Sequence, residues 1–370
     1  MVTRITNTMM TNTLLSNLSL NLNRMDKLQN QLSSGRKYGH ISDDPSALIY
    51  GQAARNKIAR VSHYQSTVET AQSWLTQAEA GIMELNKVVG AVYEELVSAG
   101  SVKTDSDKQN LAKVVAQLRD HYVDTLNTAY GDRFVFGGYN TPGDFATGQP
   151  TDIKPFQVIN NELFFNGFNI SQFDGLTTEQ FNAGLRGDPI PPSTPPAAPP
   201  PPAAQFDILR HLMNDVVSFD VGPGISMPVT QNGIDIVFYV ARNDNGQAII
   251  RNTFNTLDEV FLSINGNDRV SPPIPPVGTD DLTKQIKLVQ DAQNHLLTRT
   301  AEIGGRQRRL ELLEARYETD ALNYESMRSD AEDADIAEVI MFLKMAETVY
   351  QAALSAGARV IQPTLMDFLR

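Results

Sequence analysis

Apolar and small residues recur with a seven-residue period in the last forty residues of the chain. The steps alternate between three and four residues: Ile336, Val339, Leu343, Ala346, Tyr350, Ala353, Gly357 and Val360. This repeat predicts a helix with one narrow apolar face that needs a partner helix. The small residues on that face let a partner backbone come close, and Pro363 ends the helix because proline lacks an N–H.

The first forty residues carry a second row of this kind. It runs through Leu15, Leu18, Leu22, Met25, Gln29 and Leu32, and the polar face beside it consists mostly of Asn and Ser. A helix with a narrow apolar face and an uncharged polar face is weak alone. We therefore expect the N-terminal helix to pair with the C-terminal helix, in the same chain or in a neighbouring copy. An ordinary amphipathic helix of a monomeric domain is the alternative.

A loop should follow the first helix, which we expect to end near Leu32. Gly35 and Gly39 allow a positive φ. Asp43 or Asp44 can cap the next helix, and Pro45 suits the first turn of that helix. The adjacent carboxylates also allow a metal-site hypothesis, but a helix cap explains them more simply.

Two long heptad rows predict a helical rod. The first contains Val61, Tyr64, Val68, Ala71, Leu75, Ala78, Ile82, Leu85, Val89, Val92, Leu96 and Ala99. The second, near the C-terminus, contains Val289, Leu296, Ile303, Leu310, Tyr317 and Tyr324. A third helix should start at 104–107, carry Leu111, Val115, Leu118, Tyr122, Thr125 and Ala129, and end at Gly131. Uninterrupted rows of this length are typical of coiled-coil rods rather than globular helices.

The middle of the chain has a different pattern. Phe134 and Phe136 alternate before two glycines, which indicates a short strand and turn, and Asn160–Asn161 indicates a hairpin within 156–167. Asn232–Gly233 indicates a second two-residue turn within 226–241, and 254–264 is expected to form a short helix. The proline-rich stretch 189–202 predicts an extended linker or loop.

These patterns predict a mainly α fold with a β-rich insertion. The N- and C-terminal segments form an antiparallel rod of long helices, and the central domain is β or α+β. We expect three parts: terminal helices at 1–44 plus 331–370, a helical rod at 45–140 plus 281–330, and a variable domain at 141–280. The acidic stretch 331–338 should lie near a break between two rod segments, as a solvated or intersubunit polar face.

The composition disfavours several classes of function. The 370 residues carry a net charge of −12, which disfavours a nucleic-acid partner, and no apolar run is long enough for a membrane span. The chain has no cysteine, and its first ten residues do not read as a classical signal peptide, so export would need another route.

The five histidines are scattered and form no HExxH motif. We expect no enzymatic activity, no catalytic residue, no metal and no cofactor. Gly304–Gly305 is expected to permit close helix contact, with Arg306, Arg308 and Arg309 pairing to acids of a neighbouring rod.

The two ends of the chain resemble the bacterial flagellin superfamily. The segment LNRMDKLQNQLSSGRKYGHISDDPSA at 22–47 is similar to its N-terminal motif, and EIGGRQRRLE at 302–311 with DADIAEVIMFLKMAETVYQAALSAGARVIQPTLMDFL at 333–369 is similar to its C-terminal half. Three features, Pro45, DRFVFGGYNT and the ending IQPTLMDFL, favour the hook–filament junction proteins over the flagellins. Tyr38–Gly39–His40 departs from the family pattern, and the proline-rich tract leaves the shape of the outer domain open.

The resemblance implies a secreted, extracellular structural subunit of the flagellum. Such proteins leave the cell unfolded through a type III export channel, with a chaperone on the C-terminal segment. They form a ring, contact the neighbouring hook-associated junction protein, and support polymerisation of flagellin, while their terminal helices pair in the inner wall of the tube. Two alternatives are a filament flagellin and a surface adhesin that binds through the central domain. The first would be made in far greater amounts, and the second would bind without the terminal segments.

Overall fold

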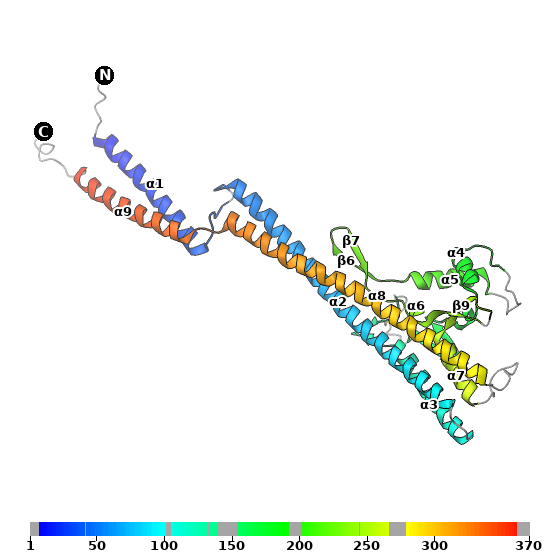
Figure 1. The fold of residues 1–370 in the computed structure, drawn as a ribbon. Helices are drawn as coiled ribbons and strands as arrows, with labels where there is room; N and C mark the ends of the chain where they lie inside the picture. Colours follow the sequence, from blue (N-terminus) through cyan, green and yellow to red (C-terminus); the bar gives the residue numbers. More distant parts are fainter. Residues whose placement is uncertain are drawn as a thin grey trace, which may run out of the picture. The chain divides into compact units, whose positions relative to one another are not determined.

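The computed structural model describes residues 7–40, 42–100, 105–131, 133–138, 154–191, 201–243, 245–265 and 279–360. Most of them are helical (Figure 1). The chain divides into two compact units, residues 1–63 with 316–370 and residues 64–315, and the two longest helices run through both. The expected division into three parts stays a prediction. Most of the proline tract and the helix end at Pro363 lie outside the described residues.

The larger unit is built along two antiparallel helices, α2 (Pro45–Ala99) and α8 (Thr279–Glu332). The predicted rows form their buried faces: Val68, Leu75, Ile82, Val89 and Leu96 on α2, and Val289, Leu296, Ile303 and Leu310 on α8, all have no exposed surface. Gln72 donates to Glu314 at 2.7 Å, and Gln307 donates to Glu79 at 2.9 Å. These contacts fix the antiparallel register and confirm the rod that the heptad spacing predicted.

A third helix, α3 (Asp105–Leu126), packs beside α7 (Thr253–Asn265). α3 ends earlier than predicted, because Asn127 exchanges two hydrogen bonds of 2.9 Å with the backbone of Phe156. Ala129, expected on the helix, instead pairs with Phe134 where β1 (Ala129–Tyr130) meets β2 (Arg133–Phe134). A tertiary contact therefore ends the helix at a point that its own periodicity does not mark.

The central part of this unit is an α+β domain of small antiparallel sheets and short helices (Figure 1). Asn160 and Asn161 have φ values of 53° and 68° and form the predicted two-residue hairpin turn. The predicted helix at 254–264 is α7. The remaining elements are β3 (Phe156–Ile159), β4 (Glu162–Phe165), β5 (Phe168–Asn169), η1 (Ser171–Phe173), α4 (Thr178–Arg186), α5 (Ala203–Asn214), β6 (Ser218–Gly222), β7 (Ile225–Pro228), α6 (Gly233–Val237), β8 (Phe238–Arg242) and β9 (Ala248–Asn252).

The expected turn at Asn232–Gly233 is wrong. The Asn232 side chain accepts a hydrogen bond from Ile234 N at 2.9 Å and caps α6, so the pair begins a helix instead of joining two strands. A side chain on Gly233 would also collide with the Phe156 ring, which accounts for a glycine at that position. In the sequence, the hairpin β6–β7 precedes α6 and the hairpin β8–β9 follows it.

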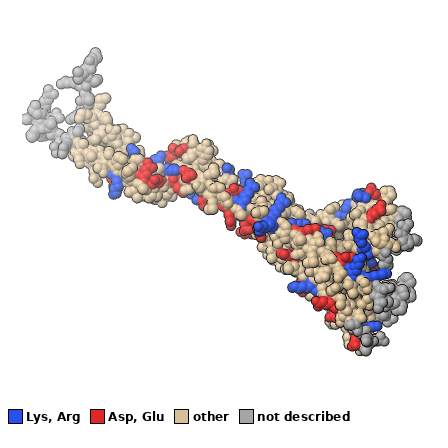
Figure 2. All heavy atoms as spheres, viewed as in Figure 1, with Lys and Arg blue, Asp and Glu red and all other residues tan. Residues whose placement is uncertain are grey.

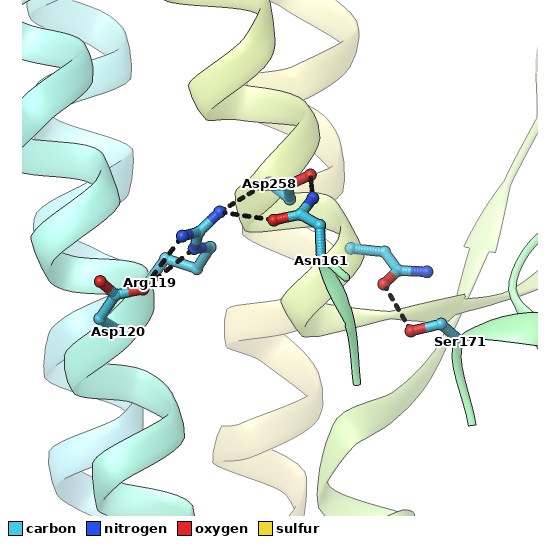
Figure 3. A network of polar contacts seen from close by, with 6 residues as sticks. Arg119, Asp120, Asn161, Ser171 and Asp258 are labelled. Atoms are coloured by element: carbon cyan, nitrogen blue, oxygen red, sulfur yellow. Dashed lines mark hydrogen bonds and ion pairs between the residues drawn. The ribbon is translucent and has the colours of Figure 1, made fainter. Parts of the chain in front are cut away.

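A polar network ties α3, the β3–β4 hairpin and α7 together (Figure 3). Arg119 on α3 contacts Asp258 on α7 at 2.5 Å and donates to the Asn161 side chain at 3.2 Å, and Asn161 also donates to Asp258. The side chains of Arg119 and Asp258 are 13 % and 12 % exposed, so little water competes for their charges. The network holds the hairpin turn against the two helices, and its groups satisfy one another.

The smaller unit contains α1 (Asn7–Ser34), α9 (Ile336–Val360), the start of α2 and the end of α8. The predicted break between the last two helices is confirmed, because residues 333–335 are not helical. Lys57 lies 5.0 Å from the centre of the Tyr324 ring, which is a cation–π contact between α2 and α8.

Candidate assembly site

The terminal helices α1 and α9 lie side by side and form the part of the chain best suited to assembly (Figure 1). Leu28, Val339 and Ala346 are buried between them. Partly buried apolar side chains surround this group: Met25, Leu32, Ala334, Phe342 and Leu343. With so few buried side chains, the pair has only a narrow apolar contact of its own.

At Gly357 the two helices lie in close contact. A Cβ placed on this residue would come within 2.6 Å of Leu14 Cδ2, closer than real contacts allow. About one and a half heptads before Gly357 on α9, the backbone oxygen of Ala346 accepts a hydrogen bond of 3.0 Å from the Asn21 side chain. The small residues therefore let α1 pack directly on the backbone of α9, as their spacing predicted.

Six of the eight predicted row residues on α9 are at least partly buried in the structure, whereas the row on α1 is partly displaced, and the role of both rows in assembly stays a prediction. Val339, Leu343, Ala346, Tyr350, Ala353 and Gly357 are all buried or half-buried, while Ile336 is 41 % exposed and the Val360 side chain is outside the described residues. On α1, Leu18, Met25 and Leu32 are partly covered, but Leu15 and Leu22 are 58 % and 45 % exposed. Leu14, Asn21 and Leu28 take their place. Leucines on adjacent positions made two registers compatible with the spacing.

Apolar side chains on the outward faces of the pair are not covered by any other residue that the structure describes. They are Met9, Met10, Leu15, Leu20 and Leu22 on α1, and Ile336, Ile340, Met341, Met345, Val349 and Leu354 on α9, each at least 41 % exposed. Charged residues are absent from 7–23 and from 348–358, and the face seen in Figure 2 is uniformly tan there. A patch of this kind on an otherwise polar protein marks an interaction surface.

Two short linkers join the terminal helices to α2 and α8, and they are bound to each other. Lys37 N donates to Glu332 O at 2.7 Å and Ala334 N donates to Gly35 O at 2.8 Å, which makes an antiparallel bridge between Arg36 and Asp333. The bridge holds the start of one linker against the other within the smaller unit.

Glu332 sits at the centre of this junction and was not recognised in the sequence. Its side chain is 5 % exposed and accepts from Arg55 Nη2 at 2.5 Å, and this hydrogen bond raises the pKa of Arg55. Burial and the Glu332 carboxylate raise the pKa of Tyr38. The Tyr38 side chain is also buried, and its hydroxyl lies beside Gly51 together with Glu332. Glu332 corrects the expectation that the carboxylates of 331–338 form a solvated or intersubunit face, because this one is buried and paired within its own chain.

The cap motif works largely as predicted. Asp44 Oδ1 accepts from Ala47 N at 3.0 Å, Pro45 is the first residue of α2, and Gly35 has a φ of 68°. Asp43 instead closes the loop, accepting from Gly39 N and His40 N and pairing with Lys27 at 3.0 Å. The hydrogen bond from Lys27 lowers the pKa of Asp43. The positive φ expected at Gly39 is not observed.

A metal site and a membrane span each require a particular arrangement of residues, and neither arrangement occurs among the described residues. Among them, no group of three His, Asp or Glu side chains is arranged to hold a metal ion, and no helix has the length and apolarity for a membrane span. His295 is half-buried and its Nε2 lies 2.7 Å from Asp235 O, and this burial lowers the pKa of His295. Its surroundings are those of a packed structural residue.

Comparison with known proteins agrees with this picture. Residues 5–141 match the family model described as the bacterial flagellin N-terminal helical region. "Flagellar hook-associated protein 3" of Escherichia coli is 22 % identical over 332 residues, which is 89 % of this chain and 88 % of that protein. The protein of the same name from Salmonella typhimurium is 29 % identical over 127 residues, 33 % of this chain and 40 % of that protein.

A solved structure shares the fold. The structure of a putative flagellar hook-associated protein from Vibrio parahaemolyticus matches with a TM-score of 0.55 at 16 % identity, covering 79 % of this chain and 100 % of that one. The match shows that about four-fifths of this chain shares the fold of that protein. The N-terminal region is thus similar to the helical region of bacterial flagellins, and most of the chain is similar to flagellar hook-associated protein 3.

Proposed function

We propose that this protein is a structural subunit of the bacterial flagellum that forms the junction between hook and filament, on which flagellin polymerises. The observation that carries the proposal is the α1–α9 pair, whose outward apolar residues are uncovered while its own buried contact is small. Burying apolar surface drives protein association. The similarity to hook-associated protein 3 supports the hook–filament junction as the location of this association.

In this role the protein is exported, lies outside the cell and acts without catalysis. Copies assemble into a ring, in which the terminal helices of neighbouring subunits cover one another's apolar residues. The ring contacts a neighbouring hook-associated junction protein on one side and flagellin on the other. The adhesin alternative places the functional surface in the central domain and leaves the uncovered faces of α1 and α9 without a role.

The test is electron microscopy of a strain from which the gene has been deleted. We expect hooks without filaments, flagellin in the medium, and restoration of filaments by the full-length chain. A variant lacking residues 1–34 is the matched control, because it keeps residues 64–315 and should not restore filaments. Filaments of normal number and length in the deletion strain would contradict the proposal.

We also propose that an export chaperone covers the apolar face of α9 before secretion. Met341, Met345 and Val349 follow one another at steps of four residues and are each about half exposed. They form a continuous apolar row of the kind that binds in the hydrophobic groove of a partner protein. A purified flagellar export chaperone should bind the full chain and not a chain lacking residues 336–370. Equal binding of the two chains would place the chaperone site elsewhere.

A further inference from the structure

Exposed methionine side chains are concentrated on the outward faces of the terminal pair. Among the methionines that the structure describes, six are at least 42 % exposed: Met9, Met10, Met83, Met327, Met341 and Met345. Four of these six lie on α1 or α9. Met227 of the central domain, in contrast, is only 2 % exposed. The accessible thioethers of the chain therefore lie mostly on the apolar surface that the fold leaves uncovered.

Met341 and Met345 are neighbouring thioethers on α9. They are four residues apart, so they lie one turn apart on the same side of the helix, and they are 55 % and 50 % exposed. Val349, which is 52 % exposed, continues this row by another four residues. Met9 and Met10 are adjacent in the sequence, so their side chains point about 100° apart around α1. Met341 and Met345 therefore share one face, whereas Met9 and Met10 face different directions.

The composition of the chain makes the methionine thioether its main target for a two-electron oxidant. The chain contains no cysteine, so no thiol of its own competes for the oxidant. Its single tryptophan, Trp74, is buried. Methionine is oxidised to the sulfoxide, and methionine sulfoxide reductases reverse this change. The exposed methionines are therefore the first side chains of the free protein that we expect to react.

Resting on the proposed function, we infer that Met341 and Met345 form a redox-sensitive modification site, at which a peroxide converts the thioethers to sulfoxides and thereby blocks assembly. With hydrogen peroxide, the sulfur attacks one oxygen, the O–O bond breaks and an S–O bond forms. The sulfur loses two electrons, and the second oxygen of the peroxide leaves as water with both hydrogens. The product is a polar side chain in place of a flexible apolar one.

A sulfoxide changes what the face of α9 offers to a partner. Its oxygen accepts hydrogen bonds, and burying such a polar group against apolar side chains is unfavourable unless a donor meets it. Under the proposed function, the partner of α9 covers Met341 and Met345 once the subunit is assembled. The site is therefore open to a peroxide in the free subunit and closed in the assembled one. Attachment depends in this way on the oxidant that the free subunit has met.

The test starts from the purified full-length chain, which is treated with hydrogen peroxide that is then removed with catalase. Peptide mapping by mass spectrometry should find sulfoxide at Met341 and Met345 while Met227 stays reduced. The treated chain and untreated flagellin are added to cells of the deletion strain, and attached filaments are counted by electron microscopy. We expect at least about tenfold fewer filaments than with the untreated chain. Incubation of the treated chain with methionine sulfoxide reductases A and B should restore the filaments.

Two double variants identify the methionines that are responsible. For each chain the readout is the ratio of filaments after and before peroxide treatment, so any effect of leucine itself on attachment cancels. Met341→Leu combined with Met345→Leu should bring this ratio close to one. The matched control, Met83→Leu combined with Met327→Leu, removes two similarly exposed thioethers outside α1 and α9 and should stay as sensitive as the original chain.

Three results would overturn the inference. One is equal sensitivity of the two double variants, in either direction. Another is normal filament attachment by a treated original chain in which Met341 and Met345 are sulfoxides. The third is oxidation of these two residues no faster than that of Met227. Failure of the untreated chain to restore filaments would instead contradict the proposed function.

Discussion

The terminal pair α1–α9 and the α2–α8 pair of residues 64–315 follow the same heptad rule but differ in what covers them. In the larger unit, nine predicted row residues have no exposed surface, and the central domain and α3 add further buried side chains. In the terminal pair, only Leu28, Val339 and Ala346 form a buried group, and eleven large apolar residues face outward. The same periodicity thus produces a well-buried rod in one region and a helix pair with exposed apolar faces in the other.

This difference indicates where stability and assembly are located. The larger unit holds itself together through burial, whereas the terminal pair, under the proposed function, gains most of its contact area from another molecule. Changes in the two regions should therefore be read out by different measurements: unfolding for residues 64–315 and filament attachment for α1 and α9.

The largest effect is expected from a charge placed in the terminal contact. Gly357→Glu puts a carboxylate where even a Cβ would collide with Leu14, and Ala353→Asp buries an unpaired charge one heptad step away. Both should abolish attached filaments and motility while leaving the thermal unfolding of residues 64–315 unchanged. Ser355→Glu, exposed on the same helix, should give a weaker defect. Normal motility in the Gly357→Glu strain would show that the terminal contact is dispensable.

Matched cavity variants should separate the two regions by stability. Ile82→Ala removes a fully buried side chain from the rod and should lower the free energy of unfolding by about 2–5 kcal/mol. Leu18→Ala, on the half-buried face of α1, should change it by less than about 1 kcal/mol, because the main transition reports the larger unit. Chemical denaturation of the free chain measures both. Similar losses for the two variants would mean that α1 is part of the cooperative core.

A pH effect on unfolding is expected from a buried carboxyl of the larger unit. Burial raises the pKa of Asp174 from its ordinary value of 3.8 to about 6, against the opposing effect of Arg251. A carboxyl with a raised pKa in the folded state favours folding while it is protonated. Its contribution is therefore complete below pH 3.8 and is lost as the pH rises through about 6. Asp174→Asn should flatten this part of the stability curve, and an unchanged slope would contradict the assignment.

The smallest effect on stability is expected at the linker junction. Glu332→Gln keeps the shape of the side chain but removes its charge opposite Arg55, whose own side chain is 42 % exposed. The melting temperature of residues 64–315 should stay the same, and filament attachment should become weaker under shear. A matched Glu338→Gln change, exposed at the start of α9, should leave attachment unchanged. Equal shear resistance of the Glu332→Gln and original chains would show that the buried ion pair does not fix the linkers.

Sequence periodicity predicted the parts of the fold that depend on repetition. The buried row of α2 and the row of α9 from Val339 to Gly357 could be identified because a seven-residue spacing is unambiguous over many turns. On α1 the same logic selected Leu15 and Leu22, since leucine also stands at positions 14, 18, 20 and 28 and the spacing allows more than one face. The structure resolves the choice through Asn21, which bonds the backbone of Ala346.

The parts that were missed depend on contacts between distant residues. Nothing near Glu332 in the sequence indicates Arg55, which is 277 residues away. The end of α3 depends on the bonds of Asn127 to Phe156, and the Asn232–Gly233 pair is compatible with either a turn or a helix start until its surroundings are known. The hairpins β6–β7 and β8–β9 have turn signals that the sequence analysis overlooked, Pro223–Gly224 and Asn245–Gly246, whose glycines have φ values of 71° and 76°.

Limited proteolysis with mass spectrometry, applied to the free chain and to assembled flagella, tests most directly whether the terminal pair is completed by assembly. In the free chain at low concentration, we predict rapid cleavage within the first 44 and last 40 residues and survival of a core near residues 45–330. In assembled flagella, the same dose of protease should leave both ends intact, because neighbouring subunits cover α1 and α9. Intact termini in the dilute free chain would contradict the account, since they would show that the pair is stable without a partner.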